Sequence, residues 1–285
     1  MEKIIKKSPA KINLGLRILE KRNDGYHNIE TIFYPLLLTD DISFEKSDFL
    51  KITSNVEKVN KLEKNLIKTA VEILEQKTGK QIHLNIFLDK NIPLGAGLGG
   101  GSSNAATTLR ALNEMYNFDL TYGVLSELAL KIGSDVPYFL NPIPAYAESR
   151  GERIEPVSLE INYPLLIVNP GIEISTKWAF ENLSPRKSNQ NELKGLASGN
   201  LDFEKLKSIL ENDFENLIFS KYPKVKEIKK EFINHGAEFA LMTGTGSSVF
   251  GIFSNLQRAN FAAEFFQQKK YFTFLNNPFQ AGSIT

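Results

Sequence analysis

Apolar residues alternate with polar ones in two segments of the N-terminal half of the chain. From residue 12 to 18 and from residue 82 to 88, every second position is isoleucine or leucine. This period of two predicts strands with one buried face. The apolar run Ile29–Leu38 predicts a further strand, and the sequence Asn23-Asp24-Gly25 before it is a turn signal. The chain is therefore expected to begin with β structure.

Later segments carry apolar residues at helical spacing. Between Asn65 and Lys77 they fall on one face, and Gly79 supplies a stop signal. The polar stretch Ser184–Asn200 is rich in Ser, Asn, Lys and Gly and is typical of a mobile connection. These patterns predict an α+β fold with two lobes, residues 1–160 and 161–285, and no internal repeat. The other elements expected are helices at 105–112, 124–132, 223–234 and 256–269, and strands at 165–169, 238–242 and 249–253.

The segment Pro93–Ala105 places five glycines within seven residues, followed by two serines and an asparagine. It lies where a strand pattern gives way to a helical one. Glycine lets backbone N–H groups approach a polyanion, and the helix N-terminus that follows adds unpaired donors and a positive dipole end. The segment therefore predicts a phosphate-binding loop, and a plain surface turn is the alternative.

Two better-known phosphate loops do not fit this segment. The P-loop requires a Gly-Lys pair before Ser or Thr, and no lysine occurs between Pro93 and Asn104. The dinucleotide fingerprint matches by letters at Gly95, Gly97 and Gly100. Its first glycine should follow the strand directly, however, and five residues intervene between Asp89 and Gly95. Both of these loop types are therefore set aside.

Composition and charge narrow the class of protein. The chain has 285 residues, of which 42% are hydrophobic, so it can bury a sizeable core. Its 34 basic and 33 acidic residues give no cationic field that would gather nucleic acid. There is no cysteine, no apolar run of bilayer length and no signal-type N-terminus, so a cytoplasmic location with no membrane contact is expected. His27, His83 and His235 are too scattered to predict a zinc site.

Three segments in the same order resemble the signature regions of the GHMP kinases, a family of small-molecule kinases with their own glycine-rich ATP loop. They are Ser8–Leu16, Pro93–Ala105 and Leu241–Phe253. The resemblance implies the two-lobed GHMP kinase fold, with an N-terminal ATP-binding lobe, a C-terminal lobe and the active site in the cleft between them. Asp24–His27 and Gly133–Pro137 are similar to the branch of the family whose acceptor is a cytidine-diphosphate-linked methylerythritol.

That branch implies transfer of the γ-phosphate of ATP to the 2-hydroxyl of the acceptor, in the non-mevalonate pathway to isoprenoid precursors. Mg²⁺ is implied by the nucleotide, because it bridges phosphate oxygens, although the sequence does not identify its ligands. No obligate protein partner is evident. Two alternatives remain at this point. One is another GHMP kinase acting on mevalonate, homoserine or a sugar, and the other is a non-catalytic nucleotide-binding protein of the same fold.

Two residues are candidates for the chemistry of phosphoryl transfer. Asp135 stands between Gly133-Ser134 and Val136-Pro137, a pattern that is also typical of a helix N-cap. Lys11 lies opposite the apolar face of its predicted strand, which places it toward solvent or a substrate cleft. The resemblance implies that Asp135 is the catalytic base and that Lys11 pairs with it, holding it ionised and stabilising charge on the attacking oxygen.

Tyr26 and His27 follow the first turn and, taken alone, are typical of a hairpin tip. Gly244 and Gly246 likewise fit an ordinary hairpin as well as a functional turn. The resemblance implies that Tyr26 and His27 hold the cytosine, with one of the loop serines, Ser102 or Ser103, near the metal. The further acceptor-binding residues that it implies are Asn13, Phe33, Thr176, Phe180, Gly244 and Gly246. The ATP-binding residues that it implies are Asn65, Leu66, Lys90, Pro93, Leu94, Gly95, Ala96, Gly97, Leu98, Gly99, Gly100, Gly101, Ser102 and Ser103.

Overall fold

The computed structural model describes residues 3–183, 193–196, 198–200 and 203–278. The chain forms two compact units, each discontinuous in sequence. Unit 1 comprises residues 1–10, 38–92 and 99–142, and unit 2 comprises residues 11–37, 93–98 and 143–285. The division into lobes at residue 160 stays a prediction.

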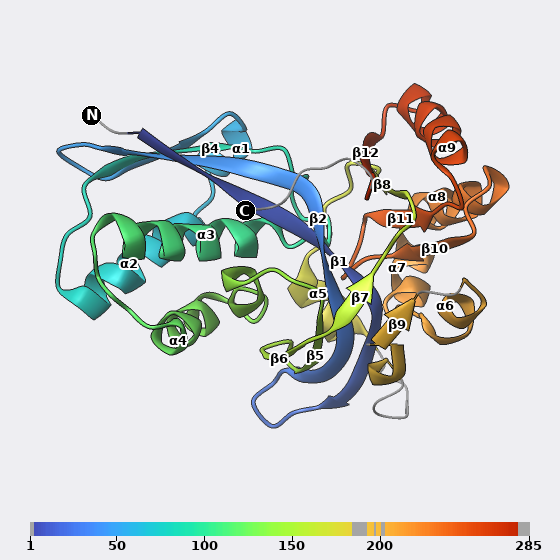
Figure 1. The fold of residues 1–285 in the computed structure, drawn as a ribbon, viewed down its shortest axis with the longest axis horizontal. Helices are drawn as coiled ribbons and strands as arrows, with labels where there is room; N and C mark the ends of the chain where they lie inside the picture. The colour runs from blue at the N-terminus through green and yellow to red at the C-terminus, as the bar shows by residue number, and fades with distance from the viewer. Residues whose placement is uncertain (1–2, 184–192, 197, 201–202, 279–285) are drawn as a thin grey trace. The chain divides into compact units, whose positions relative to one another are not determined.

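Two long strands, β1 (Lys3–Lys21) and β2 (His27–Lys46), run through both units (Figure 1). In unit 1, β4 (Leu84–Asp89) pairs antiparallel with the last residues of β2 and parallel with β3 (Lys51–Ser54). Residues of β4 are alternately buried and exposed, which confirms the period of two in the sequence. The helices of this unit are α1 (Glu57–Asn60), α2 (Leu66–Thr78), α3 (Gly100–Met115), α4 (Tyr122–Ile132) and the 3₁₀ turn η1 (Pro137–Leu140).

Helix α2 shows why its ends could be predicted from local residues. The side chain of Asn65 accepts a hydrogen bond from the backbone N–H of Ile67, which satisfies a donor that the first turn leaves open. At the other end Gly79 adopts φ = 70°, a left-handed conformation that glycine reaches at little cost. The predicted helix from Asn65 to Lys77 is therefore confirmed to within a residue at each end.

Unit 2 contains three groups of strands. Residues 29–33 of β2 pair antiparallel with one strand of a further hairpin, and a four-stranded antiparallel sheet has the order β10-β11-β8-β12. A short parallel pair joins β7 to β9. The bounds of these strands are β5 (Ala145–Ser149), β6 (Arg153–Pro156), β7 (Ser158–Glu160), β8 (Leu165–Asn169), β9 (Ser198–Asn200), β10 (Phe239–Met242), β11 (Val249–Ile252) and β12 (Phe272–Asn276).

Helices α8 (Pro223–Asn234) and α9 (Leu256–Gln268) pack on the four-stranded sheet. Phe232 of α8 meets Phe266 of α9 with ring centroids 4.8 Å apart. A Cβ atom on Gly251 of β11 would lie 2.4 Å from the Phe232 ring, so the absence of a side chain there lets this helix approach the sheet. The other helices of unit 2 are α5 (Thr176–Asn182), η2 (Lys194–Leu196), α6 (Phe203–Ile209) and α7 (Glu215–Lys221).

The structure corrects the sequence analysis in several places. The first two strands extend well beyond the predicted ranges 12–18 and 29–38, and β3, β5, β6, β7, β12, α5, α6 and α7 were not predicted. Part of the stretch 184–200, predicted to be a mobile connection, forms η2 and β9, while residues 184–192 and 197 lie outside the described residues. Short elements carry too few residues for a period to be recognised. Across the described residues, every helix falls short of the length or apolar character needed to cross a bilayer.

Candidate active site

Strand β1 places Lys11 and Asn13 in the interior of unit 2, where 4% and 2% of their surfaces are exposed. The Lys11 ammonium donates to the Asn13 side-chain oxygen and lies 4.9 Å from the ring centroid of Phe33. The Asn13 side-chain N–H donates to the Thr31 hydroxyl over 2.9 Å. Of the two alternatives that the sequence left for this face, bulk solvent or a substrate cleft, bulk solvent is therefore wrong.

The turn Thr243–Ser248 packs directly on the first part of the glycine-rich segment. A Cβ atom on Gly97 would lie 2.3 Å from the Thr243 carbonyl oxygen, and one on Gly244 would lie 2.9 Å from the Gly97 carbonyl oxygen. Both glycines also have positive φ, 76° and 57°. The backbone N–H of Ser248 donates to the Ala96 carbonyl over 3.2 Å. The two glycine-rich segments thus meet backbone to backbone, an approach that a side chain at either glycine would prevent.

Strand β1 is bonded to both glycine-rich segments. The backbone N–H of Lys11 donates to the Leu98 carbonyl over 3.0 Å, and that of Asn13 donates to the Thr243 hydroxyl over 2.9 Å. Within unit 2, Lys11, Asn13 and the segment Pro93–Leu98 therefore lie close to the turn Thr243–Ser248.

An aromatic group in unit 2 contains the residues predicted to hold a pyrimidine. His27, 8% exposed, stacks on Phe180 with ring centroids 5.5 Å apart, and Phe180 meets Phe214 edge-on at 4.9 Å. Burial, with a smaller contribution from nearby Lys21, lowers the pKa of His27, so its ring is neutral at pH 7.

Tyr26 differs from its neighbour in being half exposed. The Arg150 guanidinium lies 4.5 Å from the centroid of its ring, a cation–π contact that fixes the ring at the surface of the unit. Arg150 was not predicted from the sequence, because it stands in the turn between β5 and β6, far along the chain from Tyr26.

Helix α5 links the aromatic group to the second glycine-rich turn. It carries Phe180 near its end, while at its start the hydroxyl of Thr176 lies 3.4 Å from that of Thr245. Thr245 belongs to the turn whose Thr243 accepts from Asn13. A continuous series of contacts within unit 2 therefore leads from His27 to Lys11.

In unit 1, the second part of the glycine-rich segment forms the N-terminus of α3. Gly99 is the N-cap residue, with φ = 72°, and the helix has 16 residues. Its first N–H groups have no partner within the helix, as at every helix N-terminus. The hydroxyl of Ser103 accepts from that of Ser8 and is buried, whereas Ser102 is only partly buried. Of the two serines predicted near a metal, Ser102 is the accessible one.

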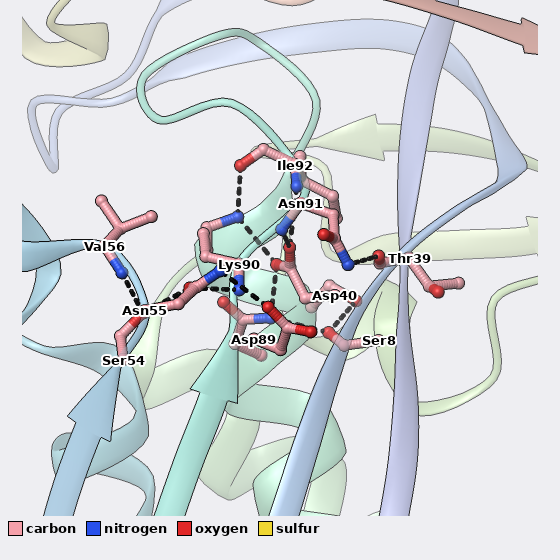
Figure 2. Close-up of polar contacts among 12 residues, drawn as sticks. Ser8, Thr39, Asp40, Ser54, Asn55, Val56, Asp89, Lys90, Asn91 and Ile92 are labelled. Carbon is pink, nitrogen blue, oxygen red and sulfur yellow. Dashed lines mark hydrogen bonds and ion pairs between the residues drawn. The ribbon is translucent and has the colours of Figure 1, made fainter.

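A buried ion pair lies beside this helix N-terminus (Figure 2). The Lys90 ammonium is 2.7 Å from a carboxylate oxygen of Asp40 and 2.6 Å from the Ile92 carbonyl oxygen, and the two charged side chains are 4% and 0% exposed. A Cβ atom on Gly100 would lie 3.0 Å from that ammonium. Burial lowers the pKa of Lys90, although the charge of Asp40 opposes the shift.

Asp40 is the centre of this cluster. Besides Lys90, it accepts from the backbone N–H groups of Asn91 and Ile92, both over 2.8 Å, and from the side chain of Asn104 over 2.9 Å. Figure 2 shows the Lys90, Asn91 and Ile92 donors around its carboxylate. The sequence alone does not single out Asp40, which stands beside Asp41 just after the predicted strand Ile29–Leu38.

Three other predicted residues lie in unit 1. Asn65 caps α2, and Leu66 lies 3.5 Å from where a Cβ atom of Gly101 would be, which places Leu66 beside the start of α3. Asp135 is half buried in the turn between α4 and η1. The N-cap residue of η1 is Val136, so the alternative in which Asp135 is that helix's N-cap is wrong.

No metal cluster is present within the described part of the chain. Its residues contain no group of three or more His, Asp or Glu side chains that could hold a metal ion. Contact of the predicted binding residues with ATP or acceptor stays a prediction. The same holds for Gly246, where an added Cβ atom would meet the side chains of Met242 and Ile174.

Two family models match the chain, and known proteins resemble it over most of its length. Residues 65–141 match the GHMP kinases N terminal domain and residues 193–271 match GHMP kinases C terminal. A 4-diphosphocytidyl-2-C-methyl-D-erythritol kinase of Chlorobium phaeobacteroides is 41% identical over 273 residues, which cover 94% of this chain and 95% of the relative. A protein of the same name from Thermodesulfovibrio yellowstonii is 38% identical, over 92% of this chain and 93% of its own.

Solved structures indicate the same class of protein. A crystal structure of 4-(cytidine 5'-diphospho)-2C-methyl-D-erythritol kinase has a TM-score of 0.76 and 30% identity, covering 95% of this chain and 98% of its own. Homoserine kinase from Cytophaga hutchinsonii, at 17% identity, has a TM-score of 0.75 over 97% of this chain and 95% of its own, which shows a shared fold alone. The chain belongs to the GHMP kinase family. It is therefore an ATP-dependent small-molecule kinase with the α+β fold that the sequence predicted.

Proposed function

We propose that this kinase transfers the γ-phosphate of ATP to the 2-hydroxyl of 4-diphosphocytidyl-2-C-methyl-D-erythritol, a step of the non-mevalonate route to isoprenoid precursors. The observation that carries the proposal is the series of contacts from the stacked pair His27 and Phe180 to Lys11. The rings that would hold a pyrimidine and the buried cation that would stabilise an alkoxide thus belong to one unit. Relatives with this activity in their names, 38% to 41% identical, support it.

The acceptor's cytosine would lie against the aromatic group. Tyr26 presents part of its ring to solvent and is held by Arg150, and the buried ring of His27 stacks on the partly buried ring of Phe180. Stacking suits a pyrimidine because its π face requires no particular set of donors. The neutral imidazole of His27 has one donor and one acceptor nitrogen, and can therefore pair with the edge of the base.

The nucleotide's phosphates would lie along the glycine-rich segment. Gly97 and Gly99 adopt positive φ, and α3 begins directly after them, so backbone N–H groups rather than a lysine would bind the anion. Lys90, predicted near adenosine, is bonded within the cluster around Asp40. We propose that Lys90 stabilises the glycine-rich segment through the Ile92 carbonyl and does not pair with phosphate.

The residues fit a magnesium ion that arrives with the nucleotide. Such an ion usually takes one or two protein ligands and completes its shell with phosphate oxygens and water, so the lack of an acidic cluster among the described residues does not conflict with it. The hydroxyl of the partly buried Ser102, in the first turn of α3, would be a ligand. Bound there, the ion would neutralise charge on the transferred phosphoryl group.

The chemistry would be divided between two charged residues. Asp135, half buried on a turn, would accept the proton of the acceptor hydroxyl. Lys11 would stabilise negative charge on the attacking oxygen, and its burial strengthens that interaction by excluding water. Asn13 holds the ammonium in place through its side-chain oxygen.

ADP release measured with a panel of acceptors tests the proposal. The expected result is turnover with 4-diphosphocytidyl-2-C-methyl-D-erythritol and none with mevalonate, homoserine or galactose. Turnover with one of the other acceptors would assign the chain to another branch of the family. ATP binding in calorimetry without ADP release for any acceptor would identify a non-catalytic nucleotide-binding protein.

A further inference from the structure

We infer that Asn169 and Asn212 are positioning residues that hold the turn Thr243–Ser248 against Pro93–Leu98, and thereby fix the backbone of the phosphate loop. The inference rests on the proposed ATP site. Neither asparagine belongs to a segment from which binding was predicted, and both are buried, with 2% and 5% of their surfaces exposed.

Asn212 holds the first part of the turn. Its side-chain N–H groups donate to the carbonyl oxygens of Met242, over 2.7 Å, and Gly244, over 2.9 Å. Its side-chain oxygen accepts from the backbone N–H of Phe214 over 3.0 Å. The amide therefore uses both of its donor hydrogens and its acceptor in fixed bonds.

Asn169, the last residue of β8, holds the other end in the same manner. Its side-chain N–H groups donate to the hydroxyls of Ser247, over 3.1 Å, and Ser248, over 3.0 Å. Its side-chain oxygen accepts from the backbone N–H of Gly171 over 2.8 Å. Two amides from separate parts of unit 2 thus hold one turn from its two ends, each anchored through an Asx-type bond to the chain two residues on.

The segment around Asn212 is itself attached to β1. Leu16 donates its backbone N–H to the Glu211 carbonyl over 2.8 Å and accepts from the backbone N–H of Asp213 over 3.0 Å. The segment that contains Asn212 is therefore bonded to the same strand, β1, that carries Lys11 and Asn13.

The turn needs such support because of its own composition. Its glycines have no side chains with which to lock the backbone, and glycine has more conformational freedom than any other residue. Gly244 nevertheless lies in direct contact with Gly97, with no side chain between them to absorb a shift. Since packed interiors transmit displacement, movement of the turn would move the loop backbone that would bind phosphate.

The test is Asn212→Asp, which keeps the size of the side chain but replaces both donors by an oxygen facing two carbonyl oxygens. Loss of these bonds should lower the affinity for ATP in calorimetry and kcat/KM for ATP by about tenfold or more. Asn113→Asp is the matched control. The partly buried Asn113 amide, near the C-terminal end of α3 in unit 1, donates to the Leu120 carbonyl over 3.2 Å and accepts from its N–H over 3.0 Å.

Positioning and plain stability give different results. If Asn212 only stabilises the fold, Asn212→Asp will lower Tm but, like Asn113→Asp, leave ATP affinity within about twofold of wild type, which overturns the inference. Should Asn212→Asp not fold, Asn169→Asp replaces it in the same measurements. Because both amides act on one turn, the loss in the double variant should be smaller than the product of the single losses. Fully multiplicative losses would contradict a shared action.

Failure of the proposed function would be seen separately, in the wild type. An absence of ADP release with every acceptor would remove the proposed reaction, while calorimetry with ATP would still compare the variants with wild type and decide the role of the asparagines.

Discussion

In unit 1 the residues at the start of α3 lie beside a buried ion pair, Lys90 and Asp40, whereas in unit 2 the segment Pro93–Leu98 lies against a turn held by neutral amides. Breaking a buried ion pair on one side costs about 3–5 kcal/mol, because an uncompensated charge remains inside. A neutral hydrogen bond contributes about 1 kcal/mol. Charge in unit 1 should therefore control whether the fold forms, and the neutral groups of unit 2 should adjust how well substrates bind.

The largest effect is expected from Asp135, a charged residue of unit 1 that is predicted to take part in the reaction. Asp135→Asn keeps the shape of the side chain and removes its basicity. We expect kcat to fall by about a hundredfold to ten-thousandfold with the KM values little changed, since general bases contribute on that order. Steady-state kinetics with both substrates measures it. A kcat near that of wild type would show that Asp135 is not the base.

Asp40→Asn tests the charged side of the comparison directly. It leaves the Lys90 ammonium buried without its counter-ion, so the free energy of unfolding should drop by about 3–5 kcal/mol in chemical denaturation. The lowered pKa of Lys90 sets a limit to the loss, because the ammonium can give up its proton instead.

The control for this prediction is an exposed ion pair of the same unit. Lys6 and Glu114 are 2.7 Å apart, with side chains 37% and 68% exposed. Glu114→Gln should change stability by less than about 1 kcal/mol, since solvent weakens exposed pairs. Equal losses of unfolding free energy for Asp40→Asn and Glu114→Gln would mean that burial does not increase the contribution of the Lys90–Asp40 pair to stability.

Tyr26→Ala tests the neutral side. Removing an exposed stacking ring should raise KM for the cytidine-containing acceptor by a factor that corresponds to about 1–3 kcal/mol, and should leave KM for ATP and the stability of the fold nearly unchanged. Parallel increases in both KM values would show that Tyr26 does not belong to an acceptor site.

The smallest effect concerns His27. Its pKa in the folded protein lies below the ordinary value of 6.5, so the unfolded chain binds the proton more readily. Stability should therefore fall as pH decreases from about 6.5 through the folded-state pKa, and should fall no further from this cause below it. His27→Phe keeps a ring against Phe180 and removes the titration. Its stability should depend less steeply on pH over that range than that of wild type, as measured by denaturation at several pH values.

Much of the fold follows from local signals along the chain. Helix α8 has the bounds that the periodicity predicted, Pro223–Asn234, because Pro at its first position and an apolar stripe on one face are local features. The strand Leu165–Asn169 is also confirmed in full. The position of the glycine-rich segment between a strand and a helix is also confirmed, while its role as a phosphate loop stays a prediction.

Short stretches of neighbouring residues identify the family and the glycine-rich segments, so the sequence alone was enough for these, and they predict which residues carry the chemistry. Three-dimensional packing was needed to show that Lys11 and Asn13 are buried, that Gly97 meets Gly244, and that Asp40 pairs with Lys90. Periodicity reports which face of an element is apolar, but it does not report what covers the opposite face. A contact between residues far apart in the chain depends on strand register and on the packing of the whole unit, and no local pattern encodes either.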